Sequence, residues 1–258
     1  MDLGNTRIKW VMADADTGMG RTQAMAWQDD AATGLAQALA AAAPPRGIWA
    51  ASVVDAEREA AVAAAMQTCF GLPVTWVRTP AEACGVRNAY AQPETLGVDR
   101  FLGMVAAHAQ GCDPCVLVSC GTALVLDALA ADGRHLGGLI APGPGLMQQA
   151  VLGATARVRP QSPGQLADAA ASTADALMSG SWQACAALVD RFVARMAGRL
   201  GDAPQVLLGG GDAHALEPLL EHAVTIYPDA VLKGLAVWVE SMTCPLPHRH
   251  SGPSTGSG

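Results

Sequence analysis

The sequence predicts an α/β fold made of two similar halves, each of which begins with a strand, a tight turn and a second strand. In the first half, Gly4-Asn5-Thr6 is a turn signal, and the residues after it alternate between polar and apolar as a strand does. In the second half, two strand-like runs within 115–129 flank a Gly-Thr turn. Segments with helical and strand-like periodicity alternate after each of these units, which is typical of an α/β protein.

Apolar periodicity and helix-capping signals define the elements of the first half. They are a hairpin at 1–13, a strand at 23–27, a helix at 34–42, a strand at 47–54, a helix at 55–70, a strand at 72–77 and a helix at 98–109. Two prolines at 44–45 end the Ala-rich helix, and Asp55 is the expected cap of the next one. The stretch at 79–95 is polar and irregular, so we expect a loop at a functional site.

The second half repeats this pattern with a longer helix. We expect strands at 115–119 and 124–129, and a third strand that leads into a Gly/Pro loop at 137–145. A helix at 146–152 and a long helix at 173–200 follow, with a loop at 161–172 between them. The last elements are a strand at 206–211 followed by a helix, a strand at 223–227 and a helix at 229–242. The chain thus divides into one domain at 1–108, a second at 109–243 and a disordered tail at 244–258, which lacks core-forming residues.

The composition describes a protein with a large core and no strongly basic surface. Of its 258 residues 51% are hydrophobic, and the formal net charge is -7 without a block of Lys or Arg. Such a surface does not attract a nucleic-acid backbone or an anionic membrane, so we expect neither as a partner. No apolar stretch approaches the roughly 20 residues of a membrane helix, and no secretory signal is visible.

Seven cysteines, an odd number, are scattered along the chain. We interpret them as reduced thiols of a cytoplasmic protein. Cys112 and Cys115 have the spacing of a CxxC pair, but a structural zinc site needs a second pair of ligands at similar spacing. We therefore expect no metal at this pair.

The two predicted turns combine glycine backbone and threonine hydroxyls with a nearby carboxylate. If they face each other across a cleft, their N–H groups and the hydroxyls of Thr6 and Thr122 hold the phosphates of a nucleotide, and a carboxylate such as Asp2 holds its metal ion. A glycine cluster at 209–211 lets backbone approach the adenosine closely. The stretch at 2–6 alone fits an ordinary β-turn equally well. Both units together predict a duplicated nucleotide-binding fold with a cleft between its halves.

A series of short motifs runs through the chain in a fixed order. They lie at 2–9, 90–100, 121–123, 137–143 with Met147 and 155–156, 173–180, 209–210 and 232–235. The ordered set resembles the type III pantothenate kinases, a family in the superfamily of acetate and sugar kinases, heat-shock ATPases and actin. The likeness runs from Asp2 to about Val237, and the segment at 90–100, which resembles the family's pantothenate-binding segment, is its most specific part. It implies two duplicated actin-like/ribonuclease H-like domains with a nucleotide cleft between them.

The resemblance implies ATP-dependent phosphorylation of the terminal hydroxyl of pantothenate to 4′-phosphopantothenate, the first step of coenzyme A synthesis. It makes Asp99 the catalytic base that takes the proton of this hydroxyl. The implied pantothenate-binding residues are Tyr90, Gly97, Val98, Arg100 and Thr173. The planar fork of Arg100 suits the pantothenate carboxylate. Without the surrounding motif, Asp99 and Arg100 fit a surface ion pair at a helix start better.

The implied ATP-binding residues come from both turns and from the later glycine cluster. They are Asp2, Gly4, Asn5, Thr6, Lys9, Gly121, Thr122, Gly209 and Gly210. Asp2 also serves Mg²⁺, directly or through water. Lys9 fits a phosphate contact and a solvent-facing hairpin position equally well. His108 and His135 match no motif residue, so we expect them to be ordinary histidines of a helix and a loop.

Two features depart from the family pattern. In the family, an acidic residue two positions before the second Gly-Thr is associated with a monovalent cation, K⁺ or NH₄⁺, and here that position is Ser119. Dependence on such a cation is therefore open, with Asp127 as a carboxylate that could compensate. The second departure is the single residue before Asp2, where the family has several apolar residues. Either the first strand is short or residues are missing from the start.

The resemblance also implies a homodimer whose substrate site lies near the subunit interface. Two other functions stay open. A family member weakened by its altered second turn could act as a nucleotide-binding regulatory accessory factor, or the chain could be a kinase of the superfamily with another small hydroxylated substrate. The retained Asp99 argues against the first, because binding alone requires no base. The segment at 90–100 argues against the second.

Overall fold

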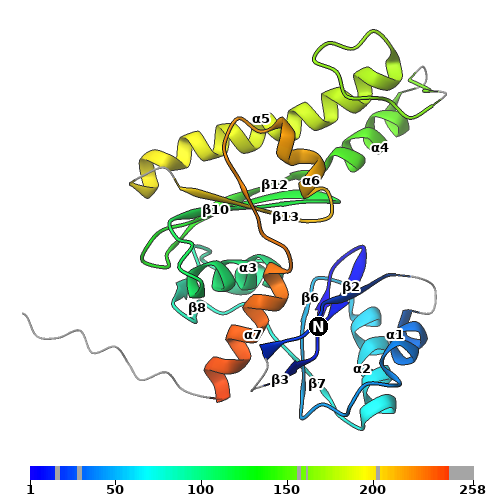
Figure 1. Cartoon of the computed structure of the whole chain (residues 1–258), viewed down its shortest axis with the longest axis vertical. Coiled ribbons are helices and arrows are strands. Elements are labelled where there is room, and N and C mark those ends of the chain that lie inside the picture. The colour runs from blue at the N-terminus through cyan, green and yellow to red at the C-terminus, as the bar shows by residue number, and fades with distance from the viewer. Residues whose placement is uncertain (15–17, 28–30, 156–157, 161, 202–203, 244–258) are drawn as a thin grey trace, which may run out of the picture.

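Two five-stranded sheets form the framework of the protein (Figure 1). The computed structural model describes residues 1–14, 18–27, 31–155, 158–160, 162–201 and 204–243. In the first sheet the strand order is β5 (Gln23–Ala26), β2 (Arg7–Trp10), β1 (Asp2–Leu3), β6 (Ile48–Ser52) and β7 (Val74–Trp76). In the second it is β12 (His135–Pro142), β11 (Ala123–Leu129), β10 (Cys115–Cys120), β13 (Gln205–Gly209) and β14 (Thr225–Ile226).

The two sheets have the same topology. β1 pairs antiparallel with β2 and parallel with β6, as β10 does with β11 and β13. The outer pairings match as well, because β2–β5 and β11–β12 are antiparallel while β6–β7 and β13–β14 are parallel. This repetition confirms the predicted α/β fold of two duplicated halves.

Helices cover the outer face of each sheet and fill the space between the sheets (Figure 1). α1 (Ala31–Leu39) and α2 (Ala56–Phe70) pack on the outer face of the first sheet. The long α5 (Thr173–Leu200), with α4 (Pro144–Ala154) and the short α6 (Ala213–Leu216), covers the outer face of the second. α3 (Val98–Ala109) and α7 (Ala230–Thr243) lie between the two sheets and contact both.

Alternation along the strands of the second sheet decides which side chains reach this middle layer. In β10, Val118 packs in the outer core beneath α5, so Leu117 and Ser119 point to the inner face, because successive strand residues alternate. In β11, Leu126 belongs to the same outer core. This places Asp127 on the inner face with Ser119.

The two middle helices pack closely against each other. Gly234 of α7 permits the approach, since a Cβ atom there would collide with the backbone carbonyl of Leu102 in α3. Leu102 and Leu235 then pack with Ala51 of β6 in one buried cluster. The middle layer therefore joins the two halves, and the domain boundary at 108/109 stays a prediction.

The structure confirms several predicted elements in detail. The helices predicted at 98–109 and 173–200 have the bounds of α3 and α5. The side chain of Asp55 accepts a hydrogen bond from the N–H of Arg58, as expected for the cap of α2.

Other elements differ from their prediction. The helix expected at 34–42 is α1, which begins earlier, at Ala31, and ends at Leu39. Gly34 lies within it rather than at its start, and it faces the end of the Met25 side chain of β5.

Several elements of two or three residues were not predicted. They are β3 (Ala13–Asp14) with β4 (Gly18–Met19), β8 (Glu82–Ala83) with β9 (Val86–Arg87), η1 (Pro93–Thr95) and η2 (Glu217–Leu219). The predicted tail at 244–258 and the motif residue at 156 lie outside the described residues. None of the described helices is both long and apolar enough to span a bilayer.

Candidate active site

A cavity of about 210 Å³ lies between the inner faces of the two sheets, where α3 and α7 begin. Its lining includes Asp2, Gly4, Lys9, Asp99, Arg100, Ser119, Asp127, Gly209, Gly210 and Asp229. The N-terminal ends of two long helices meet at one space, and their N–H groups and dipoles favour a negatively charged ligand there.

The first hairpin places Asp2 and Lys9 side by side on the inner face. They are register partners across β1 and β2, while Leu3 and Ile8 point into the outer core. The Lys9 ammonium donates to Oδ1 of Asp229 at 3.1 Å, beside the start of α7. Lys9 therefore lines the cavity, and its contact with phosphate stays a prediction.

Asp2 and Asp99 are two half-buried carboxylates that line the same cavity. Burial raises the pKa of Asp2 to about 6; the charge of Asp99 adds to the shift, and that of Lys9 opposes it. Burial also raises the pKa of Asp99 in the first turn of α3. Binding a proton or a cation here relieves the repulsion between like charges.

The start of α3 holds the Asp99 side chain in place. A Cβ atom on Gly97, which directly precedes α3, would lie 2.5 Å from Oδ1 of Asp99, so the glycine leaves the room that the carboxylate occupies. The same oxygen accepts the N–H of Arg100 at 2.8 Å. Val98 is instead buried in the middle layer and is not among the described residues that line the cavity.

The two glycine turns meet at their threonines. The hydroxyl oxygens of Thr6 and Thr122 lie 2.9 Å apart, within hydrogen-bond distance. Backbone hydrogen bonds donated by the N–H groups of Gly4 and Gly121 close the two turns, and Asn5 is exposed beside Thr6. The structure therefore brings together the two turns that the sequence places on opposite sides of a cleft.

The third glycine cluster borders the same cavity. Gly210 has a φ of +94°, and a Cβ atom there would collide with the backbone of Cys120. A Cβ atom on Gly209 would lie 2.9 Å from the carbonyl oxygen of Tyr227. Both positions need glycine for the close approach of β13 to its neighbours.

Arg100 lies in a buried network beside the cavity. Its Nε and Nη2 donate to the two carboxylate oxygens of Asp127 at 2.9 and 2.6 Å, and its Nη1 donates to the Tyr90 hydroxyl at 3.0 Å. Burial works to lower the pKa of Arg100, but the hydrogen bonds and charge of Asp127 outweigh it and hold that pKa above its usual value.

His135 belongs to this network, and the expectation of an ordinary loop histidine is wrong. It lies on β12 with a side chain that is 0% exposed, and its Nε2 lies 2.9 Å from Oδ1 of Asp127. His108 is a helix histidine as expected, and it pairs with Asp113.

Ser119 is exposed on the cavity face of β10, opposite Gly209 of β13. Asp127, the carboxylate expected to compensate, already accepts hydrogen bonds from Arg100 and lies against His135. Within the described ranges, no group of three or more His, Cys, Asp or Glu is arranged to hold a metal ion. A cation here therefore needs further ligands, such as phosphate, backbone carbonyls or water.

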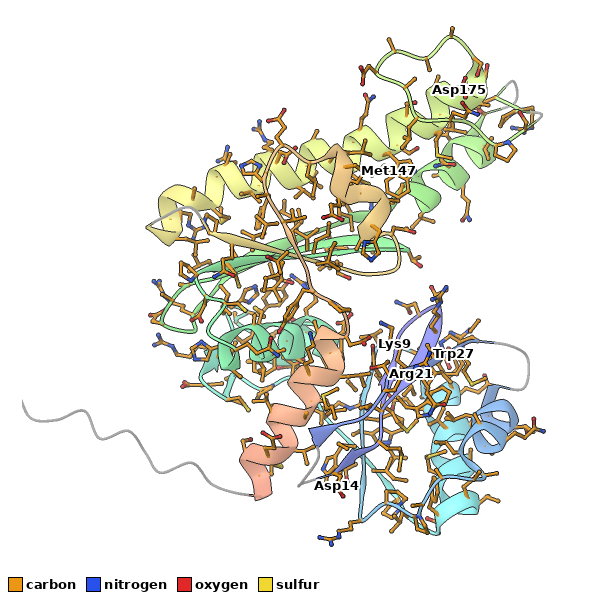
Figure 2. All side chains as sticks on the ribbon, in the orientation of Figure 1. Lys9, Asp14, Arg21, Trp27, Met147 and Asp175 are labelled. Atoms are coloured by element: carbon orange, nitrogen blue, oxygen red, sulfur yellow. The ribbon has the colours of Figure 1, made fainter. Side chains whose placement is uncertain are left out.

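Thr173 is separated from the other predicted substrate residues. It is the exposed first residue of α5. This end of the helix, which the label of the nearby Asp175 marks in Figure 2, projects away from the two middle helices. None of the described lining residues comes from α5. Within one chain, the structure does not bring Thr173 to Asp99.

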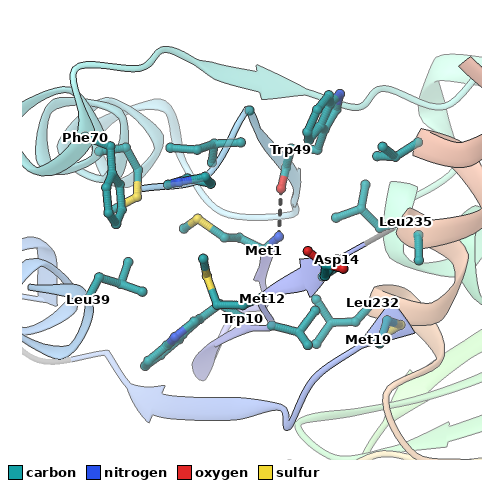
Figure 3. A pocket seen from close by; sticks show the side chains of 18 of the residues that line it. Met1, Trp10, Met12, Asp14, Met19, Leu39, Trp49, Phe70, Leu232 and Leu235 are labelled. Carbon is teal, nitrogen blue, oxygen red and sulfur yellow. Dashed lines mark hydrogen bonds between the residues drawn. The ribbon is translucent and has the colours of Figure 1, made fainter. Parts of the chain in front are cut away.

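A second cavity, of about 340 Å³, lies between β2, β6, α2 and α7 (Figure 3). Its walls are mainly apolar and include Trp10, Phe70 and Leu232; beside them the Met1 nitrogen donates to the carbonyl of Trp49 at 2.7 Å. None of its described lining residues borders the smaller cavity. The smaller cavity is the candidate site, because Asp2, Asp99 and the glycines at 209–210 converge there.

Comparison with known proteins identifies the family. The family model described as type III pantothenate kinase matches residues 1–195. The chain belongs to the type III pantothenate kinase family. A type III pantothenate kinase from Laribacter hongkongensis is 40% identical over 236 residues, and one from Stenotrophomonas maltophilia is 42% identical over 243 residues. Each match covers 92% of this chain and 95% of the relative.

Solved structures share the fold of this type III pantothenate kinase. A Campylobacter jejuni protein described as a Baf family transcriptional activator has a TM-score of 0.58 at 18% identity, covering 94% of this chain and 98% of that chain. A protein from Sinorhizobium meliloti described as a 2-dehydro-3-deoxygalactonokinase has a TM-score of 0.57 at 18% identity, covering 98% of both. At these identities the likeness concerns the fold alone, and it confirms the expected α/β fold.

Sequence reasoning missed Asp229 and His135 of this kinase, and it considered Asp127 only as a cation ligand. Asp229 is the first residue of the helix predicted at 229–242 and directly precedes α7, and an acidic residue at the start of a helix was the signal for it. No sequence signal marks His135, because its place beside Asp127 depends on the pairing of β11 with β12.

The raised pKa of Asp2 predicts that Asp2→Asn stabilises the kinase without ligands. A folded-state pKa of about 6 against an ordinary value of 3.8 corresponds to at most about 3 kcal/mol. This cost of burying the carboxylate is fully present above about pH 6 and absent below pH 3.8. The gain in the free energy of unfolding, measured by urea denaturation, should therefore be largest above pH 6 and vanish toward pH 4. The exposed loop residue Asp168 supplies the control, and an equal pH-dependent gain in Asp168→Asn would contradict the assignment.

Proposed function

We propose that this chain transfers the γ-phosphoryl group of ATP to the terminal hydroxyl of pantothenate, which begins coenzyme A synthesis, with Asp99 as the catalytic base. Family membership supports the reaction. The observation that supports Asp99 as the base is its position at the start of α3, in the cavity bordered by Asp2, Arg100 and the glycines of β13.

Phosphoryl transfer needs alignment, charge neutralisation and a proton acceptor. As the hydroxyl oxygen bonds to the γ-phosphorus and the bond to the leaving oxygen breaks, the hydroxyl proton passes to Asp99. Burial raises the pKa of Asp99 and makes it a stronger proton acceptor than an exposed aspartate. The helix N-termini and the Lys9 ammonium face the phosphates, and the hydroxyls of Thr6 and Thr122 hydrogen-bond them.

Asp2 fits the role of protein ligand to Mg²⁺, directly or through water. Mg²⁺ in such sites uses one or two carboxylates together with phosphate oxygens and waters, so a single buried carboxylate suffices. When bound, Mg²⁺ neutralises charge on the transferring phosphates. Asp2 lies close enough to Asp99 for their charges to interact, and a cation beside them offsets both.

The comparisons do not support the alternative of a regulatory accessory factor. The relatives at 40–42% identity are named kinases. The likeness to a protein described as a transcriptional activator is at 18% identity and carries no functional argument. We also propose a cytoplasmic location, which is consistent with the free thiols of the described cysteines, including Cys112 and Cys115.

The first test concerns the base. Asp99→Asn should lower turnover at least about 100-fold, because an amide cannot take the proton, while ATP binding survives. Turnover is measured with an assay of ADP release with and without pantothenate, and ATP binding by calorimetry. Glu94→Gln changes an exposed carboxylate of the same segment and should keep near-native turnover. Near-native turnover in Asp99→Asn would remove Asp99 from the mechanism.

We further propose a homodimer joined through β12 and α4. β12 is an edge strand, and large apolar side chains are exposed on it and on α4: Leu139, Ile140, Leu146 and Val151. Exposed edge strands and apolar patches commonly mark interfaces. A second copy would cover these side chains. It would also let Thr173 of the partner subunit approach the substrate site of this chain, whereas the Thr173 of this chain lies away from it.

Light scattering should therefore report the mass of two chains. Ile140→Asp should shift the mass toward one chain and lower turnover, because a charge in an apolar interface is costly to bury. Met242 has the same exposed fraction as Ile140, 65%, but lies at the end of α7. Met242→Asp should remain a dimer. A monomeric native protein with full activity would contradict the proposal.

Ser119 predicts a weak dependence on monovalent cations. A neutral hydroxyl offers a K⁺ ion less electrostatic stabilisation than the family's carboxylate does. Titrating K⁺ against activity should give a shallow response for the native kinase and for Ser119→Ala. Ser119→Asp should respond more steeply, because it adds the missing charge. Identical responses of the native kinase and Ser119→Asp would show that position 119 is not at the cation site.

A further inference from the structure

The larger cavity, of about 340 Å³, lies in line with β1. β1 consists of Asp2–Leu3 alone, whereas its neighbour β6 has five residues. The Met1 nitrogen adds one more bond to the parallel ladder by donating to the carbonyl of Trp49 at 2.7 Å. Past this bond, the space between β2 and β6 belongs to the cavity.

The register of β1 with its two neighbours gives the length of this space. Asp2 pairs with Lys9 of β2 and with Ala51 of β6. Three extended residues ahead of Met1 would therefore lie opposite residues 11–13 on one side and residues 47–49 on the other. All six of these positions line the cavity. Its walls thus match a strand that is three residues longer than the present one.

The cavity passes through the plane of the first sheet. Leu39 and Phe70 of the outer helices line it on one side of Met1, and Leu232 and Leu235 of α7 line it on the other (Figure 3). Met1 packs in the outer core, so the residue before it would face α7 and the one before that would face the outer helices. Apolar side chains on both faces of an added strand would therefore meet apolar walls.

The second sheet contains the longer form of the same strand. Asp2 and Ser119 each lie on an inner face, two positions before the glycine of their turn. By this equivalence, the three positions ahead of Met1 correspond to Cys115–Leu117, the first half of β10. These three residues are apolar, and none of them is exposed. β10 pairs with all five residues of β13, whereas β1 pairs with only two of the five in β6.

Two polar groups at the cavity are poorly accommodated. Burial lowers the pKa of the Met1 amino group to about 5, and the charge of Asp2 opposes this shift. Among the described residues, Nε1 of Trp10 is the buried side-chain polar atom that lacks a hydrogen-bond partner. A peptide bond at Met1 would remove the charge and keep the N–H that Trp49 accepts, and an added strand would bring backbone carbonyls into the cavity beside Trp10.

We propose that the larger cavity is a strand slot, which binds three extended, apolar residues joined to the Met1 nitrogen and so lengthens β1 to match β10. Backbone groups alternate along a strand, so the N–H of Trp49 and both backbone groups of Val11 point into the slot and complete the ladder with the added residues. Asp2 directly follows Met1. An occupied slot therefore restrains the strand that carries Asp2 into the candidate site. The inference does not depend on the proposed reaction.

The test compares the native chain with chains that carry three residues between an initiator methionine and Met1. Val-Ile-Leu should raise the urea midpoint of unfolding by at least about 0.5 M, because it buries apolar side chains on both faces of the sheet. Gly-Ser-Gly removes the charge from Met1 equally but cannot fill the slot, so its midpoint should stay near the native value. Val-Asp-Leu directs a carboxylate toward Leu39 and Phe70 and should lose the gain.

Hydrogen exchange shows where the added residues lie. In the Val-Ile-Leu chain, the amides of Val11 and Trp49 should exchange at least about tenfold more slowly than in the Gly-Ser-Gly chain, because both then donate to the added strand. Equal midpoints of these two chains would overturn the inference. A higher midpoint without slower exchange at Val11 and Trp49 would also overturn it, since the added residues would then pack outside the slot. Neither result would bear on pantothenate phosphorylation by the native kinase.

Discussion

The close packing of α3 against α7 between two sheets is the constraint on which the candidate site depends. It requires a glycine at position 234, because the Cβ atom of any other residue would collide with the backbone of Leu102. Because both helices begin at the same edge of the middle layer, Asp99 and Asp229 face one space. The central strands β1 and β10 approach this space from opposite sides and deliver Asp2 and Ser119 on their inner faces. The packing of the two helices and the two central strands, rather than any single loop, thus positions the polar side chains of the cavity.

This arrangement places charged side chains in and beside the cavity, and the two sides of the cavity compensate these charges differently. On the side of the second sheet, Arg100 and Asp127 neutralise each other with side chains that are only 7% and 5% exposed, and Tyr90 and His135 complete their hydrogen bonds. Such a pair is rigid because neither member can leave without stranding the other. On the side of the first sheet, Asp2 and Asp99 repel each other, and Lys9 is shared with Asp229. One side of the cavity is therefore neutral and preorganised, whereas the other is acidic and gains from a cation.

Local patterns in the sequence predicted much of the fold, whereas Asp99, Arg100 and the other predicted residues that line the cavity followed from the family resemblance. The two turns, the bounds of α3 and α5 and the duplicated order of strands follow from periodicity, glycine positions and caps, which are short-range properties. The place of His135 could not be predicted, since it depends on a register shift between β11 and β12 and on the stacking of a distant tyrosine. Thr173 illustrates the opposite case. Thr173 was predicted from its motif, but its distance from Asp99 depends on the direction in which the long helix α5 extends from the second sheet.

Ser119 and Asp127 lie on the same inner face of the second sheet, yet they affect the cavity in opposite ways. Asp127 contributes almost no net charge to the cavity, because Arg100 compensates it at hydrogen-bond distance. A carboxylate at position 119 would have no such partner and would add a negative charge opposite Gly209, facing Asp2 and Asp99 across a cavity of about 210 Å³. Serine keeps this face neutral and lowers the repulsion felt by a polyphosphate. In the proposed function, Asp2 of the first sheet then serves the divalent cation, and the neutral face of the second sheet has less need of a monovalent one.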